Sequence, residues 1–161
     1  MNLQVWVAVI VGIAAVVEDL ARRRISNWIP CLAFVGGLAA QALAHGWRGV
    51  GASLLGSVAG FLVFLVFYLV GGMGGGDVKL MAGFGAVLGV KKLLEAALWT
   101  AACGGLIAAA VIAIGSLRAL WISSRSGASG AAAVFGARQT KTIPYAPAIA
   151  AGVWLSLVPK M

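Results

Sequence analysis

Long runs of apolar residues, separated by short groups of charged residues, make up most of this sequence. Six apolar stretches contain no charged residue, at positions 2–17, 25–47, 49–76, 80–90, 96–117 and 142–159. A helix of about 20 apolar residues crosses the hydrocarbon core of a bilayer. The pattern therefore predicts an all-α polytopic membrane protein, a bundle of about six transmembrane helices, with residues 1–161 forming one transmembrane domain.

Two of these stretches are too short to cross a membrane on their own. The first would form a helix of about 24 Å, whereas the hydrocarbon core is about 30 Å thick. Its helix is therefore expected to continue through Glu18, Asp19 and Leu20. The stretch 80–90 has 11 residues, so its helix is expected to begin near Asp77. Both extensions place an aspartate at the membrane boundary or just inside it.

The composition supports a membrane protein and changes how the charge is interpreted. Hydrophobic residues are 62% of the chain and charged residues 10%, against about 25% charged in soluble domains. The net charge of +8 would suggest a nucleic-acid partner in a soluble chain, but these basic residues lie between apolar stretches. They indicate orientation and contact with anionic lipid instead. With the N-terminus outside, eight of the 12 basic residues lie on the inner side, as the positive-inside rule requires.

Acidic residues are scarce, so the candidates for carboxylate chemistry are few: Glu18, Asp19, Asp77 and Glu95. Counting membrane crossings places Asp19 and Asp77 at the same inner face. Two carboxylates brought together in a medium of low dielectric constant share one proton. Such a pair can hold a water molecule, and this arrangement is suited to aspartic proteolysis.

Other interpretations of these aspartates remain open at this stage. Asp77 follows a run with five glycines in six residues, 71–76, so it is also a candidate N-cap of the next helix. The glycines are unsuited to a helix interior and permit close approach by an extended peptide. Asp19 is a candidate partner for Arg22 or Arg23. A proton-linked transporter would also use two intramembrane aspartates, and a non-catalytic membrane subunit would tolerate their loss.

No metal or other cofactor is expected. The two cysteines, Cys31 and Cys103, lie within apolar stretches and are interpreted as core residues. His45 lies near the end of a stretch and is interpreted as an interfacial residue. These side chains do not have the spacing of a metal site.

Three parts of the sequence together resemble the type IV prepilin peptidases, the membrane aspartic proteases with a Gly-x-Gly-Asp motif. They are the segment from Asp19 to Asn27 with its three arginines, the segment 74–80 (Gly-Gly-Gly-Asp-Val-Lys-Leu), and the segment 143–152 (Ile-Pro-Tyr-Ala-Pro-Ala-Ile-Ala-Ala-Gly). They occur in the order of the family. The similarity is to the small single-module form associated with Flp/Tad pili, although Ser26 stands where that family usually has proline.

The resemblance implies an aspartic endopeptidase of the bacterial inner membrane, acting at the cytoplasmic face. Its substrate would be a prepilin with a short basic leader ending in glycine, ahead of an apolar helix. Asp19 and Asp77 would be the catalytic pair, and Gly74 and Gly76 the motif glycines. The chain lacks the Cys-rich N-terminal domain of the longer, bifunctional enzymes, so N-methylation of the product is not expected.

Four further assignments concern residues outside this pair. Glu18 is predicted to tune the approach of the basic leader, and Lys79 to meet lipid phosphate or the substrate backbone. Glu95 is interpreted as an interfacial ion partner. The segment 118–141 is predicted to be an inner loop that gates substrate entry.

Overall fold

The computed structural model describes residues 3–71, 73–125 and 145–158. Within these residues the chain is all-helical, as predicted, without a strand. The elements are α1 (Leu3–Arg22), α2 (Trp28–Leu69), α3 (Gly75–Arg125) and α5 (Ala146–Leu157). By length and apolar composition, α1, α2 and the part of α3 up to Leu117 are able to cross a membrane, whereas α5 has 12 residues.

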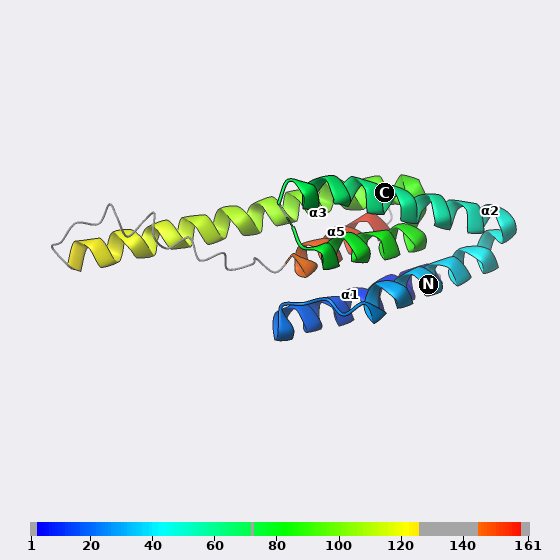
Figure 1. Ribbon diagram of the computed structural model, residues 1–161, viewed down its shortest axis with the longest axis horizontal. Coiled ribbons are helices and arrows are strands. Elements are labelled where there is room, and N and C mark those ends of the chain that lie inside the picture. The colour runs from blue at the N-terminus through cyan, green and yellow to red at the C-terminus, as the bar shows by residue number, and fades with distance from the viewer. Residues whose placement is uncertain (1–2, 72, 126–144, 159–161) are drawn as a thin grey trace.

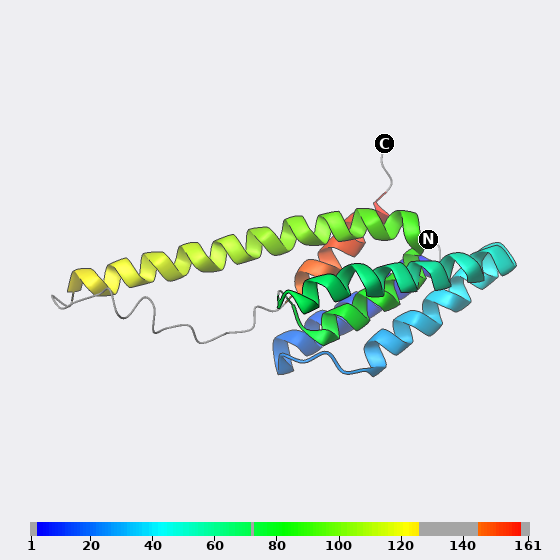
Figure 2. The same cartoon turned by 45° about the horizontal axis from the view of Figure 1, so that its top comes forward.

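The structure does not support the prediction of six separate transmembrane helices, because α2 and α3 each join two of the predicted stretches. The charged residues between those stretches, including Arg48 and Lys91, are themselves helical. One residue in each long helix departs from helical geometry, Gly46 in α2 and Gly89 in α3. Both helices fold back on themselves along their length (Figures 1 and 2).

Glycine makes each of these reversals possible. Gly46 has φ 57° and Gly89 has φ 71°, a region that other residues enter only at a steric cost. The carbonyl of Val87 lies two residues before the break at Gly89. The buried amide of Gln41 donates from Nε2 to this oxygen at 3.2 Å. A side chain of α2 thus stabilises the reversal of α3.

The most extensive packing is between α2 and α3. Their backbones approach so closely at Gly56 and Gly85 that a Cβ on either glycine would overlap the backbone of the other helix. Small residues allow such contacts between helices in a membrane. The core around them is formed mainly by buried aliphatic side chains and includes Ile29, Leu80, Met81, Phe84, Leu93, Ile149 and Val153.

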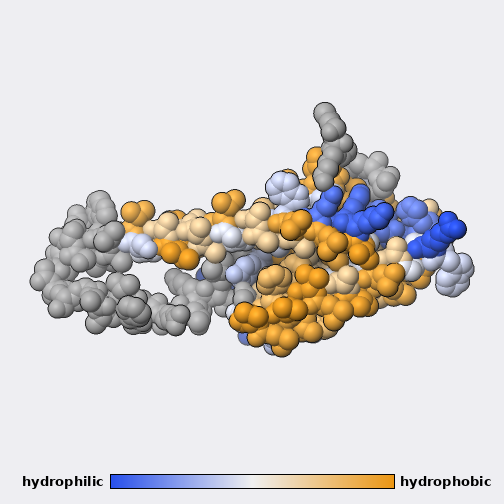
Figure 3. Space-filling model, turned by 90° about the horizontal axis from the view of Figure 1, so that it is seen from above, coloured by the Kyte–Doolittle hydropathy of each residue, from blue (hydrophilic) through white to orange (hydrophobic). Residues whose placement is uncertain are grey.

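On the face shown in Figure 3 the bundle is largely hydrophobic, with a group of hydrophilic residues on one side. Large apolar side chains of α1, α2 and α3 are exposed there. The end of α3 leaves the bundle and projects beyond it (Figures 1 and 2). An apolar exterior suits a lipid environment, as the composition suggested.

Two predicted helix boundaries near the aspartates are confirmed, and the predicted loop 118–141 is corrected. α1 continues past Glu18 and Asp19 to Arg22, and α3 begins at Gly75, just before Asp77. The predicted loop 118–141 is wrong in its first part, because α3 remains helical to Arg125. The run of Ala, Leu, Trp and Ile after Arg118 contains no glycine or proline that would end the helix. The rest of that segment lies outside the described residues.

Candidate active site

Asp19 lies one turn before the end of α1 and is buried, with 7% of its surface exposed. Its Oδ2 accepts a hydrogen bond from the backbone N–H of Ala146 at 3.2 Å. Ala146 is the first residue of α5, where N–H groups have no partner within the helix. The start of α5 therefore holds the Asp19 carboxylate in place.

Asp77 is the third residue of α3 and is buried to a similar degree, with 8% of its surface exposed. The carbonyl of Gly74 accepts from the N–H of Asp77 at 3.1 Å, and Asp77 Oδ2 accepts from the N–H of Gly74 at 3.1 Å. Two reciprocal hydrogen bonds of this kind join the cap residue of a helix to an acidic residue at the third helical position. The N-cap alternative for Asp77 is therefore wrong, because Gly74 occupies the cap position.

The structure brings the two aspartates to the same end of the bundle, where the last turn of α1 meets the first turns of α3 and α5 (Figure 1). Each carboxylate is held through Oδ2 by one backbone N–H. No hydrogen bond within the described part of the chain engages either Oδ1. Among the described residues, one oxygen of each carboxylate is thus left without a donor.

The contacts do not support the alternative that Asp19 serves only as a partner for an arginine. Arg22 forms its ion pair with Glu18, at 3.8 Å. The side chain of Arg23 forms neither an ion pair nor a hydrogen bond with the Asp19 carboxylate among the described contacts. The direct partner of Asp19 is the backbone of α5.

Gly76 allows the α1–α2 connection to pass close to the first turn of α3. A Cβ at Gly76 would lie 3.2 Å from Cβ of Ile25, which is tighter than nearly all such contacts. At Gly74, a Cβ would lie 3.4 Å from Asp77 Oδ2, an ordinary contact. Of the two predicted motif glycines, Gly76 is the one at which space is restricted.

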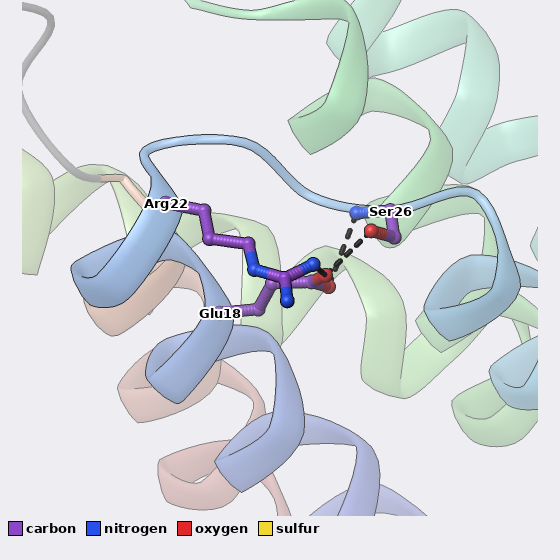
Figure 4. Close-up of polar contacts among 3 residues, drawn as sticks. All are labelled: Glu18, Arg22 and Ser26. Carbon is purple, nitrogen blue, oxygen red and sulfur yellow. Dashed lines mark hydrogen bonds and ion pairs between the residues drawn. The ribbon is translucent and has the colours of Figure 1, made fainter.

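Glu18 contacts the α1–α2 connection, as Figure 4 shows. Its carboxylate accepts from the Ser26 backbone N–H at 3.1 Å and from the Ser26 hydroxyl, in addition to the Arg22 ion pair. A proline at this position would supply neither donor. The predicted role of Glu18 in leader approach stays a prediction, but its oxygens already have partners within the chain.

Lys79 also contacts this connection. Its Nζ donates to Oδ1 of Asn27 at 3.0 Å. Sequence reasoning did not anticipate this partner, nor the contacts of Ser26 and Ala146. All three lie within the motif segments described above, but a motif does not reveal which of its residues touch.

No group of three His, Cys, Asp or Glu side chains that could hold a metal was found among the residues the structure describes. Cys31 is an exposed free cysteine and Cys103 a half-buried one, so the interpretation of Cys31 as a core residue is wrong. Cys31 lines a hollow between α2 and α3, together with Phe34, Phe61 and Lys79. The expectation that catalysis needs no metal stays a prediction.

Comparison with known proteins gives two matches. The sequence model of the type IV leader peptidase family matches residues 6–109, about two thirds of the chain, including both aspartates. The chain is 39% identical over 103 residues to the prepilin leader peptidase/N-methyltransferase of Bacillus subtilis (strain 168). That match covers 63% of this chain and 34% of the relative, so the chain spans about a third of the relative's length. No solved structure matches significantly.

Proposed function

The chain belongs to the type IV leader peptidase family, and from this premise we propose that it is an aspartic endopeptidase that cleaves the leader peptide from prepilin precursors. One observation carries the aspartic mechanism: two buried aspartates, each held by a backbone N–H, lie at the same end of an apolar bundle. Buried carboxylates without a counter-ion are costly in such a setting, and function commonly accounts for them.

The chemistry follows from the arrangement of the two carboxylates. The two carboxyl groups share one proton. Their Oδ1 atoms hold a water molecule next to the carbon of the peptide carbonyl. The ionised aspartate takes a proton from this water while the protonated one donates to the carbonyl oxygen. The water oxygen adds to the carbonyl carbon and forms a tetrahedral intermediate. Its collapse breaks the C–N bond: the carboxyl that took the water proton gives a proton to the leaving amine, and the other carboxylate takes a proton back from a hydroxyl of the intermediate.

The glycine-rich segment before α3 gives the substrate a place to lie. Its residues 73–76 include three glycines and lead directly into Asp77. The lack of side chains leaves backbone groups accessible to an extended peptide. In the proposed complex the scissile bond lies across this segment, between Asp77 and Asp19, with the Gly76–Ile25 contact as one boundary of the site.

We further propose that the protein lies in the bacterial inner membrane, with the N-terminus outside and the catalytic end at the cytoplasmic face. The interruptions at Gly46 and Gly89 divide α2 and α3 into two segments each. With α1 and α5, these make six helical segments to account for the six apolar stretches. Arg22, Arg23 and Arg24 then lie at the inner face, where the positive-inside rule favours them.

The substrate in this proposal is a prepilin of the Flp type, with a short basic leader ending in glycine ahead of an apolar helix. The product is the shortened pilin with a free amino terminus, without N-methylation. The relative from Bacillus subtilis is named as both a leader peptidase and an N-methyltransferase, so methylation of the product is to be assayed separately.

The test is cleavage of such a prepilin by the purified protein in detergent. Asp19→Asn and Asp77→Asn are expected to lower kcat by about 1,000-fold or more, within the range for loss of a general acid or base. Glu95→Gln, which removes an acid placed on another segment of the bundle, is the matched control and should cleave normally. A chelator should have no effect on the wild-type rate.

Three results would overturn the proposal. The first is an intact rate in either aspartate variant at equal amounts of folded protein. The second is loss of activity with the chelator and its recovery with added metal. The third is the absence of cleavage for every prepilin with a leader of this type.

A further inference from the structure

Two adjacent residues of the α1–α2 connection reach in different directions. Ser26 donates to Glu18 of α1, through both its backbone N–H and its hydroxyl. Asn27 accepts from Lys79 of α3 at 3.0 Å. Ile25, just before them, lies against Gly76 of α3. Residues 25–27, here called the strap, therefore connect the two helices.

The attachment points of the strap adjoin the two aspartates. On α1, Glu18 is the immediate neighbour of Asp19. On α3, Gly76 immediately precedes Asp77, and Lys79 is half a turn further on. The contact between α1 and α3 is much smaller than those that α3 makes with α2 and α5. Direct packing therefore contributes little to holding the two aspartate-bearing turns together, and the strap supplies a second connection.

We propose that the strap sets the separation of Asp19 and Asp77, and that Glu18, Ser26, Asn27 and Lys79 are positioning residues. For its consequence in catalysis this inference rests on the proposed peptidase function. None of the four side chains takes a proton or touches the scissile bond in this scheme. Their contacts keep two carboxylates, borne by different helices, at the distance at which they can share one water molecule.

The first experiment measures this separation without relying on activity. Spin labels are placed on Leu20→Cys and Gly75→Cys, two exposed positions beside the aspartates, in a Cys31→Ser, Cys103→Ser background. Electron–electron double resonance then gives the distance distribution between the labels. Lys79→Met and Ser26→Ala are each expected to broaden the distribution. Arg48→Met, which removes an exposed cation from the middle of α2, should leave it unchanged.

The second experiment separates positioning from substrate binding. Lys79→Met and Asn27→Ala should each lower kcat by about three- to tenfold, with KM unchanged, because small displacements of catalytic groups act on the chemical step. The double variant should be no slower than either single variant, since both remove the same contact. Lys79→Arg keeps a donor and should restore most of the rate. If Lys79 instead binds lipid phosphate or substrate backbone, KM rises, and the losses of the Lys79 and Asn27 variants are additive.

The two experiments distinguish failure of the strap from failure of the proposed function. If the wild-type protein cleaves no prepilin while Lys79→Met still broadens the label distances, the strap stands and the peptidase proposal falls. If cleavage is normal but Lys79→Met and Ser26→Ala change neither the distances nor kcat, the strap is overturned. Equal broadening by Arg48→Met would overturn it as well, because the effect would then be a general loss of rigidity.

Discussion

The two aspartates are equally buried, but the chain holds them in different ways. Asp77 is held by Gly74, three positions before it, within the first turn of its own helix. Asp19 is held by Ala146, 127 positions later in the chain. Forming the α3 start is enough to orient the first carboxylate, whereas the second is oriented only once α5 packs against α1. One half of the candidate site is thus local structure, and the other half depends on the packing of the whole bundle.

The position of α5 is accordingly as important to Asp19 as the sequence around it. Trp154 of α5 donates from Nε1 to the carbonyl of Ala8 in α1 at 3.3 Å. On the other side, Gly152 lies directly against the backbone of α3, near Ala96 and Thr100. These contacts place the start of α5, and with it the N–H of Ala146, beside Asp19.

Lengthening each carboxylate by one methylene group tests this difference most strongly. Asp19→Glu and Asp77→Glu should each lower kcat/KM by about 100-fold, because a displacement of about 1 Å has that effect on a positioned group. Their stabilities should differ. Glutamate suits the third position of a helix, so Asp77→Glu should keep the thermal midpoint of the wild type. Asp19→Glu should lower it, because the added methylene must fit a packed site.

Thermal unfolding in detergent and prepilin cleavage are the measurements for these two variants. Glu95→Asp, an equal change of length in an acid outside the site, should affect neither kcat/KM nor the midpoint. Equal destabilisation by Asp19→Glu and Asp77→Glu would contradict the distinction between a local and a long-range anchor.

A displacement of α5 tests the long-range anchor by itself. Gly152→Ala places a Cβ 2.6 Å from the backbone nitrogen of Thr100, so α5 must shift. Overpacking of this kind costs about 1–3 kcal/mol, and kcat should fall by about tenfold as the N–H of Ala146 moves away from Asp19. Gly105→Ala, on α3 with open space around it, is the matched control. The long-range anchor is refuted if Gly152→Ala lowers the thermal midpoint but cleaves at the wild-type rate.

Two neighbouring glycines test the local anchor with the smallest change. Gly76→Ala brings a Cβ to 3.2 Å from Ile25, whereas the nearest atom to a Cβ at Gly75 is 3.7 Å away, on Tyr68. Gly76→Ala should lower kcat by about twofold to fivefold through a shift of the connection. Gly75→Ala should raise the free energy of unfolding by about 0.5–1 kcal/mol, because alanine is favoured over glycine in a helix. The measurements are prepilin cleavage kinetics and thermal unfolding of both variants. Equal kcat values for Gly76→Ala and Gly75→Ala would contradict the restricted space at Gly76.

Features that depend on the local sequence were predictable, whereas those that depend on distant contacts were not. The extension of α1 past Asp19 and the start of α3 near Asp77 were predictable, because both follow from helix length and the position of the glycine run. The exact points at which α2 and α3 reverse, Gly46 and Gly89, were not. Each of these glycines lies two residues before a charged residue that separates two apolar stretches, but nothing in the local pattern distinguishes them from the many other glycines.

An apolar, all-helical chain with four acidic residues, two of them in family motifs, could be recognised from composition and motif order, because these properties belong to the residues themselves. The partners of those residues could not. The hydrogen bonds concerned join residues that are 8 to 127 positions apart: Ala146 with Asp19, Ser26 with Glu18, and Asn27 with Lys79. Such contacts form only after the helices pack, because packing brings a donor and an acceptor within hydrogen-bonding distance whatever their separation along the chain.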